Sequence, residues 1–227
     1  MVLRAPRIRV NAYGDAEAHD VFRAFTARHR RFKMTSAKKW GVALMALPDT
    51  GDAYLASVSR QARRARAKAM AAGYHYRVVD PKTRIDEIIA IHASTPSRQG
   101  RPMAAGYLDP ADVAATVGSR AAIHGVLDGD GVLQAYGHVL DIGDAFTFTF
   151  LIGHADRLKD GIMYLLVESI VRACVADRRP DGSPRWLMAD TFWGASDGLA
   201  YFKERTGFQA YTVSWVWTGN PPCADPR

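Results

Sequence analysis

Three short apolar segments follow one another in the middle of the chain and constrain its fold more than any other feature. They are predicted to be strands over residues 121–127, 132–140 and 145–152. The connections between them read Asp-Gly-Asp-Gly at 128–131 and Asp-Ile-Gly-Asp at 141–144. Turns of this composition join antiparallel strands. The sequence therefore predicts a three-stranded antiparallel meander.

Helices and strands are predicted on both sides of the meander. Before it, strands are expected at 7–13, 40–47 and 75–79, and helices at 16–31, Asp52–Gly73, 83–94 and in a short segment ending at about Val117, after a polar connection at 95–109. After it come a helix at 159–177, a strand at 186–189, a helix at 196–205 that stops at Gly207, and a strand at 208–218. This order predicts an α/β chain with an α+β mixed sheet. We expect one domain over residues 1–219 and a flexible tail at 220–227.

The composition excludes several classes of protein. The chain of 227 residues is 48% hydrophobic and 23% charged, which is typical of a globular protein with a sizeable core. No apolar stretch approaches the roughly 18 residues of a membrane-spanning helix, and the first residues do not resemble a secretory signal. Cys174 and Cys223 follow neither a metal-binding nor a redox spacing. We expect a cytoplasmic protein without a metal, and the oligomeric state stays open.

The basic charge of the chain is concentrated in one segment. Residues 21–79 hold thirteen Lys or Arg and two Asp, a net charge of +11, whereas the whole chain carries +7. Such a local field attracts a polyanion, and nucleic acid is the commonest one in a cell; a solvated helix face without a ligand is the alternative. The candidate phosphate-binding residues are Arg28, Arg30, Arg31, Lys38, Lys39, Arg60, Arg63, Arg64, Arg66 and Lys68.

Three stretches resemble one known family. Residues 198–208 read Gly-Leu-Ala-Tyr-Phe-Lys-Glu-Arg-Thr-Gly-Phe, which is similar to the Gly-Leu-x-x-Phe-Lys-x-x-x-Gly-Phe closure of Fem-like proteins. The basic segment from Ser57 to Gly73 resembles their basic helix, and 92–101 resembles their Thr-x-x-Arg-x-Gly segment. The meander followed by helix, strand, helix and strand looks like the second half of the GNAT acyltransferase fold. The resemblance covers about residues 52–217.

The resemblance implies an aminoacyltransferase with a GNAT-like fold. Fem-like proteins use aminoacyl-tRNA as the donor, so tRNA would be both co-substrate and partner, without a further cofactor. The length of the chain fits a single-domain form, as in antibiotic assembly. The implied acceptor is therefore the amine of a small peptide or a peptidyl-nucleoside.

One turn separates this chain from ordinary GNAT enzymes, which hold the coenzyme A pyrophosphate with Gln/Arg-x-x-Gly-x-Gly/Ala at a helix N-terminus. The corresponding segment here, Leu158–Met163, has Leu at the first position, Met at the last and an Asp between them. A coenzyme A thioester is therefore expected only under one alternative, an acyl-CoA-dependent N-acetyltransferase. A second alternative is a non-catalytic nucleic-acid-binding relative.

The resemblance also assigns site residues. Lys203 would stabilise the tetrahedral oxyanion, with a solvent-facing helix lysine as the alternative. Asp190 would orient the incoming amine or take its proton, with a helix-capping Asp as the alternative. The substrate-binding candidates are Arg98, Arg101, Tyr107, Trp193 and Phe202. Glu168 is expected on the surface, and His124, His138 and His154 are expected to be satisfied core or turn residues, since their spacings match no metal motif.

Overall fold

The computed structural model describes residues 5–29, 35–95, 97–98 and 101–219, and the side chains of residues 97, 98, 101 and 102 are not among what it describes. The described chain forms two compact units. Unit 1 comprises Met1–Asp49, Val139–Phe148 and Cys174–Arg227, and unit 2 comprises Thr50–His138 and Thr149–Ala173. The single domain over residues 1–219 stays a prediction, and the expected tail at 220–227 lies outside the described residues.

Within the described residues, eight strands form one mixed sheet in the order β1-β10-β2-β9-β8-β7-β6-β3. The pairs β1–β10 and β8–β9 are parallel, whereas β10–β2, β2–β9, β6–β7 and β3–β6 are antiparallel. This arrangement confirms the predicted α/β class with a mixed sheet. The strands are β1 (Arg7–Ala12), β2 (Val42–Ala46), β3 (His75–Val79), β6 (Ile123–Leu127), β7 (Leu133–Asp141), β8 (Ala145–Gly153), β9 (Trp186–Thr191) and β10 (Gln209–Trp217).

Helices begin where a short polar side chain can cap them. The oxygens of Asp15, Thr50, Ser59, Asp109 and Ser196 each accept a hydrogen bond from a backbone N–H of the first turn that follows. The helices are α1 (Ala16–Thr26), α2 (Gly51–Ser57), α3 (Arg60–Ala71), α4 (Ile85–Ala93), α5 (Pro110–Thr116), α6 (Ile162–Ala176) and α7 (Asp197–Arg205). Short 3-10 turns cover η2 (Pro81–Arg84), η3 (Ala105–Tyr107) and η4 (Ala155–Asp160).

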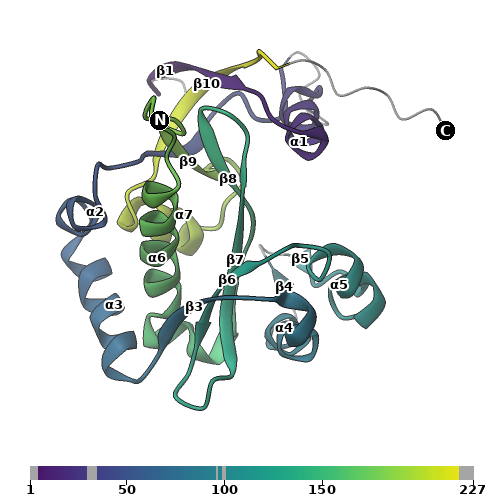
Figure 1. Cartoon of the computed structure of the whole chain (residues 1–227), viewed down its shortest axis with the longest axis vertical. Coiled ribbons are helices and arrows are strands. Elements are labelled where there is room, and N and C mark those ends of the chain that lie inside the picture. The colour runs from purple at the N-terminus through teal and green to yellow at the C-terminus, as the bar shows by residue number, and fades with distance from the viewer. Residues whose placement is uncertain (1–4, 30–34, 96, 99–100, 220–227) are drawn as a thin grey trace. The chain divides into compact units, whose positions relative to one another are not determined.

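Unit 1 is built around α1 and the strands β1 and β10, which lie side by side in Figure 1. Phe25 on α1 packs against Trp215 on β10 with ring centroids 5.0 Å apart. Val10, Val213 and Met188 complete the same buried cluster. Burial of these apolar side chains holds the ends of β2, β9 and β10 in fixed positions, and the candidate site lies at those ends.

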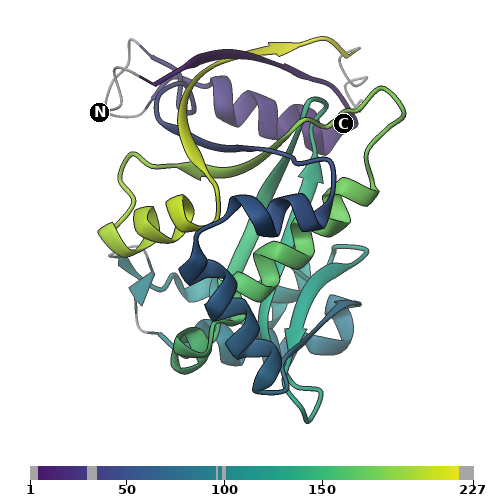
Figure 2. The ribbon, with the colours of Figure 1, turned by 90° about the vertical axis from the view of Figure 1, so that its left-hand side faces the viewer.

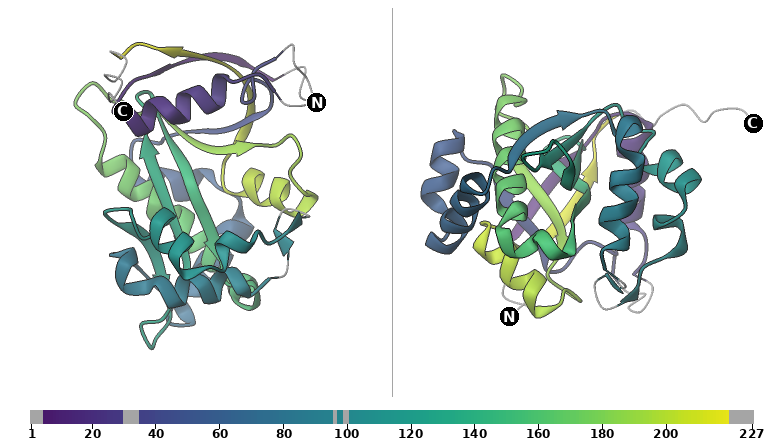
Figure 3. Two further views of the ribbon diagram at one scale, coloured as in Figure 1. Left: turned by 90° about the vertical axis from the view of Figure 1, so that its right-hand side faces the viewer. Right: turned by 90° about the horizontal axis from the view of Figure 1, so that it is seen from below.

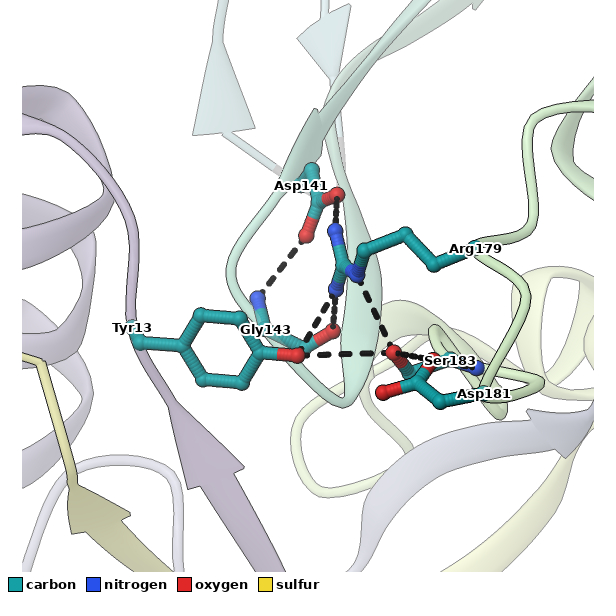
Figure 4. Close-up of polar contacts among 6 residues, drawn as sticks. All are labelled: Tyr13, Asp141, Gly143, Arg179, Asp181 and Ser183. Carbon is teal, nitrogen blue, oxygen red and sulfur yellow. Dashed lines mark hydrogen bonds and ion pairs between the residues drawn. The ribbon is translucent and has the colours of Figure 1, made fainter.

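A network of polar contacts around Arg179 also stabilises unit 1. Arg179 donates to the Asp141 carboxylate at 2.5 Å, to the Tyr13 hydroxyl at 3.0 Å and to the Gly143 carbonyl at 2.6 Å (Figure 4). Its Nε also donates to Ser183 Oγ at 3.0 Å. One guanidinium therefore ties the end of β1, the β7–β8 turn and the loop before β9 together, since its donors are arranged in a rigid planar fork.

Unit 2 has its own core, in which α4 and α5 lie side by side (Figure 3). Ile88 and Ile91 on α4 meet Val113 on α5, and Leu133 and Tyr136 on β7 pack against them. These positions follow the helical spacing expected for residues 83–94. The connection before α5 contains a short hairpin, β4 (Ser97–Arg98) and β5 (Arg101–Pro102), where the sequence predicted only a polar loop.

The long helix predicted from Asp52 to Gly73 is wrong in one respect, because the structure has two helices there. Figure 2 shows the change of direction between α2 and α3, both dark blue. Val58 and Ser59 are extended, and Ser59 Oγ accepts from the N–H of Ala62 at 3.1 Å. A serine that caps the next helix breaks the preceding one, because its side chain competes with the helical backbone hydrogen bonds.

Two further expectations need correction. The helix predicted over residues 16–31 ends at Thr26, after which Arg28 forms an isolated β-bridge with Ser36. Glu168 was expected on the surface, yet it is buried on α6. Its carboxylate forms ion pairs with Arg66 and Arg172, which supply the positive charge that a buried carboxylate requires.

Candidate functional site: a charged cluster at the end of β9

The candidate site begins with the backbone at the end of β9. Asp190 has φ +58°, a left-handed conformation that costs a residue with a Cβ about 1 kcal/mol and that Asp tolerates better than most residues. The chain turns there, and the N–H of Phe192 donates to the Gly41 carbonyl at 2.8 Å. A strained residue held by its surroundings is typical of functional sites.

Lys38 is placed beside Asp190 by the segment that precedes β2. Trp215 Nε1 donates to the Lys38 carbonyl at 2.6 Å, and the N–H of Val213 donates to the Lys39 carbonyl at 2.8 Å. With its backbone fixed in this way, the Lys38 ammonium forms an ion pair with the Asp190 carboxylate. The sequence predicted a phosphate contact for Lys38, whereas the structure brings it to the predicted catalytic aspartate.

Lys203 reaches the same place from α7. The helix starts at the Ser196 cap and stops at Gly207, as predicted, where φ is +94°. Lys203 is 5% exposed, and its Nζ donates to the Thr191 carbonyl at 2.7 Å. The same ammonium lies 5.7 Å from the centroid of the Phe192 ring. It is therefore a buried cation, not a solvent-facing helix lysine.

The surroundings of Lys203 change its acidity. Burial lowers the pKa of its ammonium from 10.5 to about 8, because desolvation disfavours the charged form. The Asp190 carboxylate raises this pKa and the Lys38 ammonium lowers it. Near neutral pH Lys203 is thus a poorly solvated cation that can donate to a developing negative charge. It can also release its proton at mildly alkaline pH.

Several aromatic residues lie near the cluster in the sequence, and the Phe192 ring also contacts it through Lys203. Trp193 is 48% exposed and stacks on His29 with centroids 6.0 Å apart. Phe202 precedes Lys203 on α7 and is half-buried. Sequence reasoning missed His29 and Phe192: the first lies inside the basic segment, and the second is one apolar residue among many in a strand end. Only the fold brings them to the cluster.

Three basic side chains of helix α3, in unit 2, form local contacts. Arg63 donates to the carbonyls of Leu55, Ala56 and Val58, which end α2. Arg66 pairs with Glu168 at 3.4 Å. Lys68 donates to the Lys159 carbonyl at 2.8 Å. These three side chains stabilise the packing of α2, α3 and the start of α6.

The other predicted phosphate-binding residues lie in different surroundings, and Arg28, which follows α1, is exposed. Arg60 and Arg64 are exposed on α3, and their side chains form no hydrogen bond or ion pair with any residue that the structure describes. Lys39 lies over the Trp40 ring at 5.3 Å. Arg30 and Arg31 lie outside the described residues.

The remaining substrate-binding candidates belong to unit 2. Arg98 and Arg101 pair through the backbone of β4 and β5, and their side chains are not among those described. Tyr107 accepts a hydrogen bond at its carbonyl from His92 Nδ1 at 2.6 Å. Of the predicted site residues, the structure therefore brings together Lys203, Asp190 and Lys38.

The turn that would hold a pyrophosphate is crowded in unit 2. Gly161 has φ +89°, and a Cβ there would stand 2.1 Å from the Ala65 carbonyl oxygen of α3. The Asp160 carboxylate accepts from the Tyr74 hydroxyl at 3.1 Å and lies 3.8 Å from the Lys68 ammonium. The approach to the N–H groups at the start of α6 is thus occupied by α3 and by a carboxylate.

Two of the three histidines that were expected to be satisfied have side-chain partners. The expectation is wrong for His154, whose buried Nδ1 has no hydrogen-bond partner among the residues that the structure describes. His124 Nδ1 and the Tyr76 hydroxyl are 2.7 Å apart, as are His138 Nδ1 and Thr149 Oγ1. In the part of the chain that the structure describes, no three His, Cys, Asp or Glu side chains are grouped so that they could hold a metal ion. Among these residues no helix is both long and apolar enough to cross a membrane.

Comparison with known proteins identifies the fold. No family model and no curated protein matches the chain. FemX matches with a TM-score of 0.56 at 10% identity, over 75% of this chain and 59% of FemX. A conserved protein of unknown function from Bacteroides thetaiotaomicron matches with a TM-score of 0.51 at 13% identity, over 75% and 59%. L-PGS from Bacillus licheniformis matches at 14% identity with a TM-score of 0.49, over 75% and 60%.

The chain therefore spans about three fifths of the length of these proteins. At identities this low, the similarity indicates a shared fold and nothing further. The FemX and Bacteroides structures, with TM-scores above 0.5, are the two that support it. The chain shares the mixed α/β fold of FemX, and the mixed sheet that the order of its elements predicted is confirmed.

Proposed function

We propose that this chain is an aminoacyltransferase that moves an amino acid from aminoacyl-tRNA onto the amine of a small peptide or peptidyl-nucleoside. The observation that carries the proposal is the buried Lys203 ammonium, held at the Thr191 carbonyl beside Asp190. Its place in a Gly-Leu-x-x-Phe-Lys motif and the FemX-like fold support the same reading. Because tRNA is charged in the cytoplasm, the reaction would take place there.

The chemistry fits the geometry of the cluster. The amine attacks the ester carbonyl, a C–N bond forms, and the ester C–O bond to the tRNA ribose breaks. The tetrahedral oxyanion needs a preorganised positive donor, and the Lys203 ammonium is one that has already lost much of its hydration. The Asp190 carboxylate accepts hydrogen bonds from the incoming ammonium or takes its proton, while Lys38 holds that carboxylate in place. The leaving ribose oxygen takes up the proton that the amine releases.

Two observations favour tRNA over coenzyme A as the donor carrier. The start of α6 is covered by α3 and by Asp160, which leaves little room for a pyrophosphate. The outward-facing Arg60 and Arg64 offer phosphate contacts without local partners. The two alternatives, an acyl-CoA-dependent N-acetyltransferase and a non-catalytic nucleic-acid-binding protein, make different predictions for donor use.

A donor competition tests the proposal. Total tRNA charged with radiolabelled amino acids is incubated with the protein and candidate amines, with labelled acetyl-CoA in a parallel tube. We expect label to move from tRNA to a small product, to be lost in Lys203→Met and to persist in Arg205→Met, a cation removed from the same helix. Transfer from acetyl-CoA alone would overturn the proposal in favour of the acetyltransferase. Binding of tRNA without transfer would favour the non-catalytic alternative.

A further inference from the structure

Unit 2 contains a cavity of about 420 Å³ that the proposed transfer reaction does not use. It lies between η3, α5 and the Phe150 side chain of β8, with His92 of α4 also in its wall. Small-molecule sites in proteins commonly have volumes of about 300–1000 Å³ and mostly apolar walls with a few polar groups. The size of this cavity falls within that range.

The wall of the cavity is held rigidly around one histidine. His92 is 1% exposed, and its Nδ1 must carry a proton because its partner at 2.6 Å, the Tyr107 carbonyl oxygen, can only accept. Its Nε2 lies 2.6 Å from the Tyr136 hydroxyl. Two hydrogen bonds therefore fix the ring, and the Tyr107 ring packs edge-on against it at 5.0 Å. A preorganised wall loses little entropy when a ligand binds.

The lining residues that the structure describes are mostly apolar. Tyr107, Phe150, Val113 and Val117 supply aromatic and aliphatic surface. Asp112 is the charged residue among them, and its exposed side chain forms no hydrogen bond or ion pair with any other residue that the structure describes. A ligand with an apolar body and a positively charged group would therefore complement these residues.

The Asp112 carboxylate lies directly beside Gly106 in the wall of the cavity. A Cβ on Gly106 would stand 2.7 Å from Asp112 Oδ2, so a side chain at this position would require the carboxylate to rotate away. The aromatic rings of Tyr107 and Phe150 also attract a cation through their negative faces. Carboxylate and rings favour the same kind of ligand.

We infer that this cavity is a binding site for an aromatic or aliphatic primary ammonium, with its apolar body against Tyr107, Phe150 and Val113 and its ammonium at Asp112. The inference does not depend on the transfer reaction. It gives Tyr107, a substrate-binding candidate from the sequence, a place in the wall of this cavity.

Three probes with the same indole body test the inference on the full chain: tryptamine, tryptophol and indole-3-propionate. Binding is followed by the ¹³C methyl shifts of Val113 and Val117. We expect saturable shifts with tryptamine, weaker binding of the neutral alcohol, and the weakest binding of the carboxylate. The ammonium–carboxylate contact at a partly exposed site corresponds to an affinity difference of up to about fivefold.

Variants then locate the contact. Asp112→Asn should weaken tryptamine binding to the level of tryptophol, while Asp86→Asn, an exposed carboxylate in the first turn of α4, should leave it unchanged. Ala104→Trp, at an exposed lining position, should weaken all three probes at least tenfold. Absence of saturable methyl shifts with wild-type protein would overturn the inference. Equal affinities for the three probes, or an Asp112→Asn variant that binds tryptamine like wild type, would do the same.

Discussion

The two charged regions of this molecule use the same residue types in opposite ways. At the end of β9, Lys38, Asp190 and Lys203 form a small cluster in which one cation is 5% exposed and has a pKa lowered to about 8. Along α3 the charges lie at the surface, where Arg63, Arg66 and Lys68 bind carbonyls or carboxylates of unit 2. Basic residues of the same type therefore differ by their surroundings: burial lowers the pKa of Lys203, whereas Arg63, Arg66 and Lys68 stabilise the packing around α3.

The strongest predicted effect is a loss of stability when the buried carboxylate that pairs with α3 is removed. Glu168→Ala removes a buried carboxylate and its two charge-assisted contacts with Arg66 and Arg172, so we expect a loss of about 3 kcal/mol in the free energy of unfolding, at roughly 1.5 kcal/mol for each contact. Glu204→Ala removes an exposed carboxylate on α7 and should change it by less than about 0.5 kcal/mol. Urea unfolding followed by circular dichroism measures both. If both variants changed the free energy of unfolding by the same small amount, Glu168 would contribute little to the packing of α3.

The second prediction concerns turnover in variants of Lys203. Lys203→Met should reduce the turnover of aminoacyl transfer about a hundredfold while KM for the donor changes little, because an oxyanion donor acts in the transition state. Lys203→Arg keeps a cation and should retain part of the activity. Single-turnover assays with both variants check this, and full activity in Lys203→Met would assign Lys203 a packing role like that of Arg66.

A smaller predicted effect distinguishes the residues of α3 that would bind tRNA from those that stabilise its packing. The double variant Arg60→Ala/Arg64→Ala should weaken tRNA binding about tenfold and reduce the steepness of its salt dependence, since each lost phosphate contact lowers the slope by about 0.7–0.9. Arg77→Ala/Lys82→Ala removes two exposed cations elsewhere in unit 2 and is the matched control. Fluorescence anisotropy at several salt concentrations distinguishes them. Identical slopes for the two double variants would assign α3 no special part in tRNA binding.

The smallest effect concerns pH. Between the Lys203 pKa of about 8 in the folded chain and its ordinary 10.5, the unfolded chain holds a proton that the folded chain has released. Stability contributed by this group therefore rises as pH increases from about 8 to 10.5. Lys203→Met, which lacks the buried charge, should exceed wild type in Tm below pH 8, by about 2–4 °C per kcal/mol, and the gap should narrow above it. A difference in Tm between Lys203→Met and wild type that stays constant from pH 8 to 10.5 would contradict the lowered pKa of Lys203.

The region around Lys203 was partly visible in the sequence. The order of strands and helices, the Ser196 cap, the Gly207 stop and the Gly-Leu-x-x-Phe-Lys run are local patterns, so they can be recognised without coordinates. They were sufficient to predict the mixed α/β fold and to single out Lys203. The break at Ser59 was not recognised, because a serine inside a strong helical pattern looks tolerable until its hydroxyl caps the next helix.

Local patterns in the sequence located most strands and helices, the distribution of charge and the lysine of the motif. The pairing of Lys38 with Asp190, the stacking of His29 on Trp193 and the burial of Glu168 between two arginines could be seen only in the folded chain. The tertiary structure also decided that His92, Tyr107 and Asp112 line one cavity. The physical reason is distance along the chain: local propensities act over a few residues. Contacts such as that between Lys38 and Asp190 depend instead on which strands pair and which faces are buried.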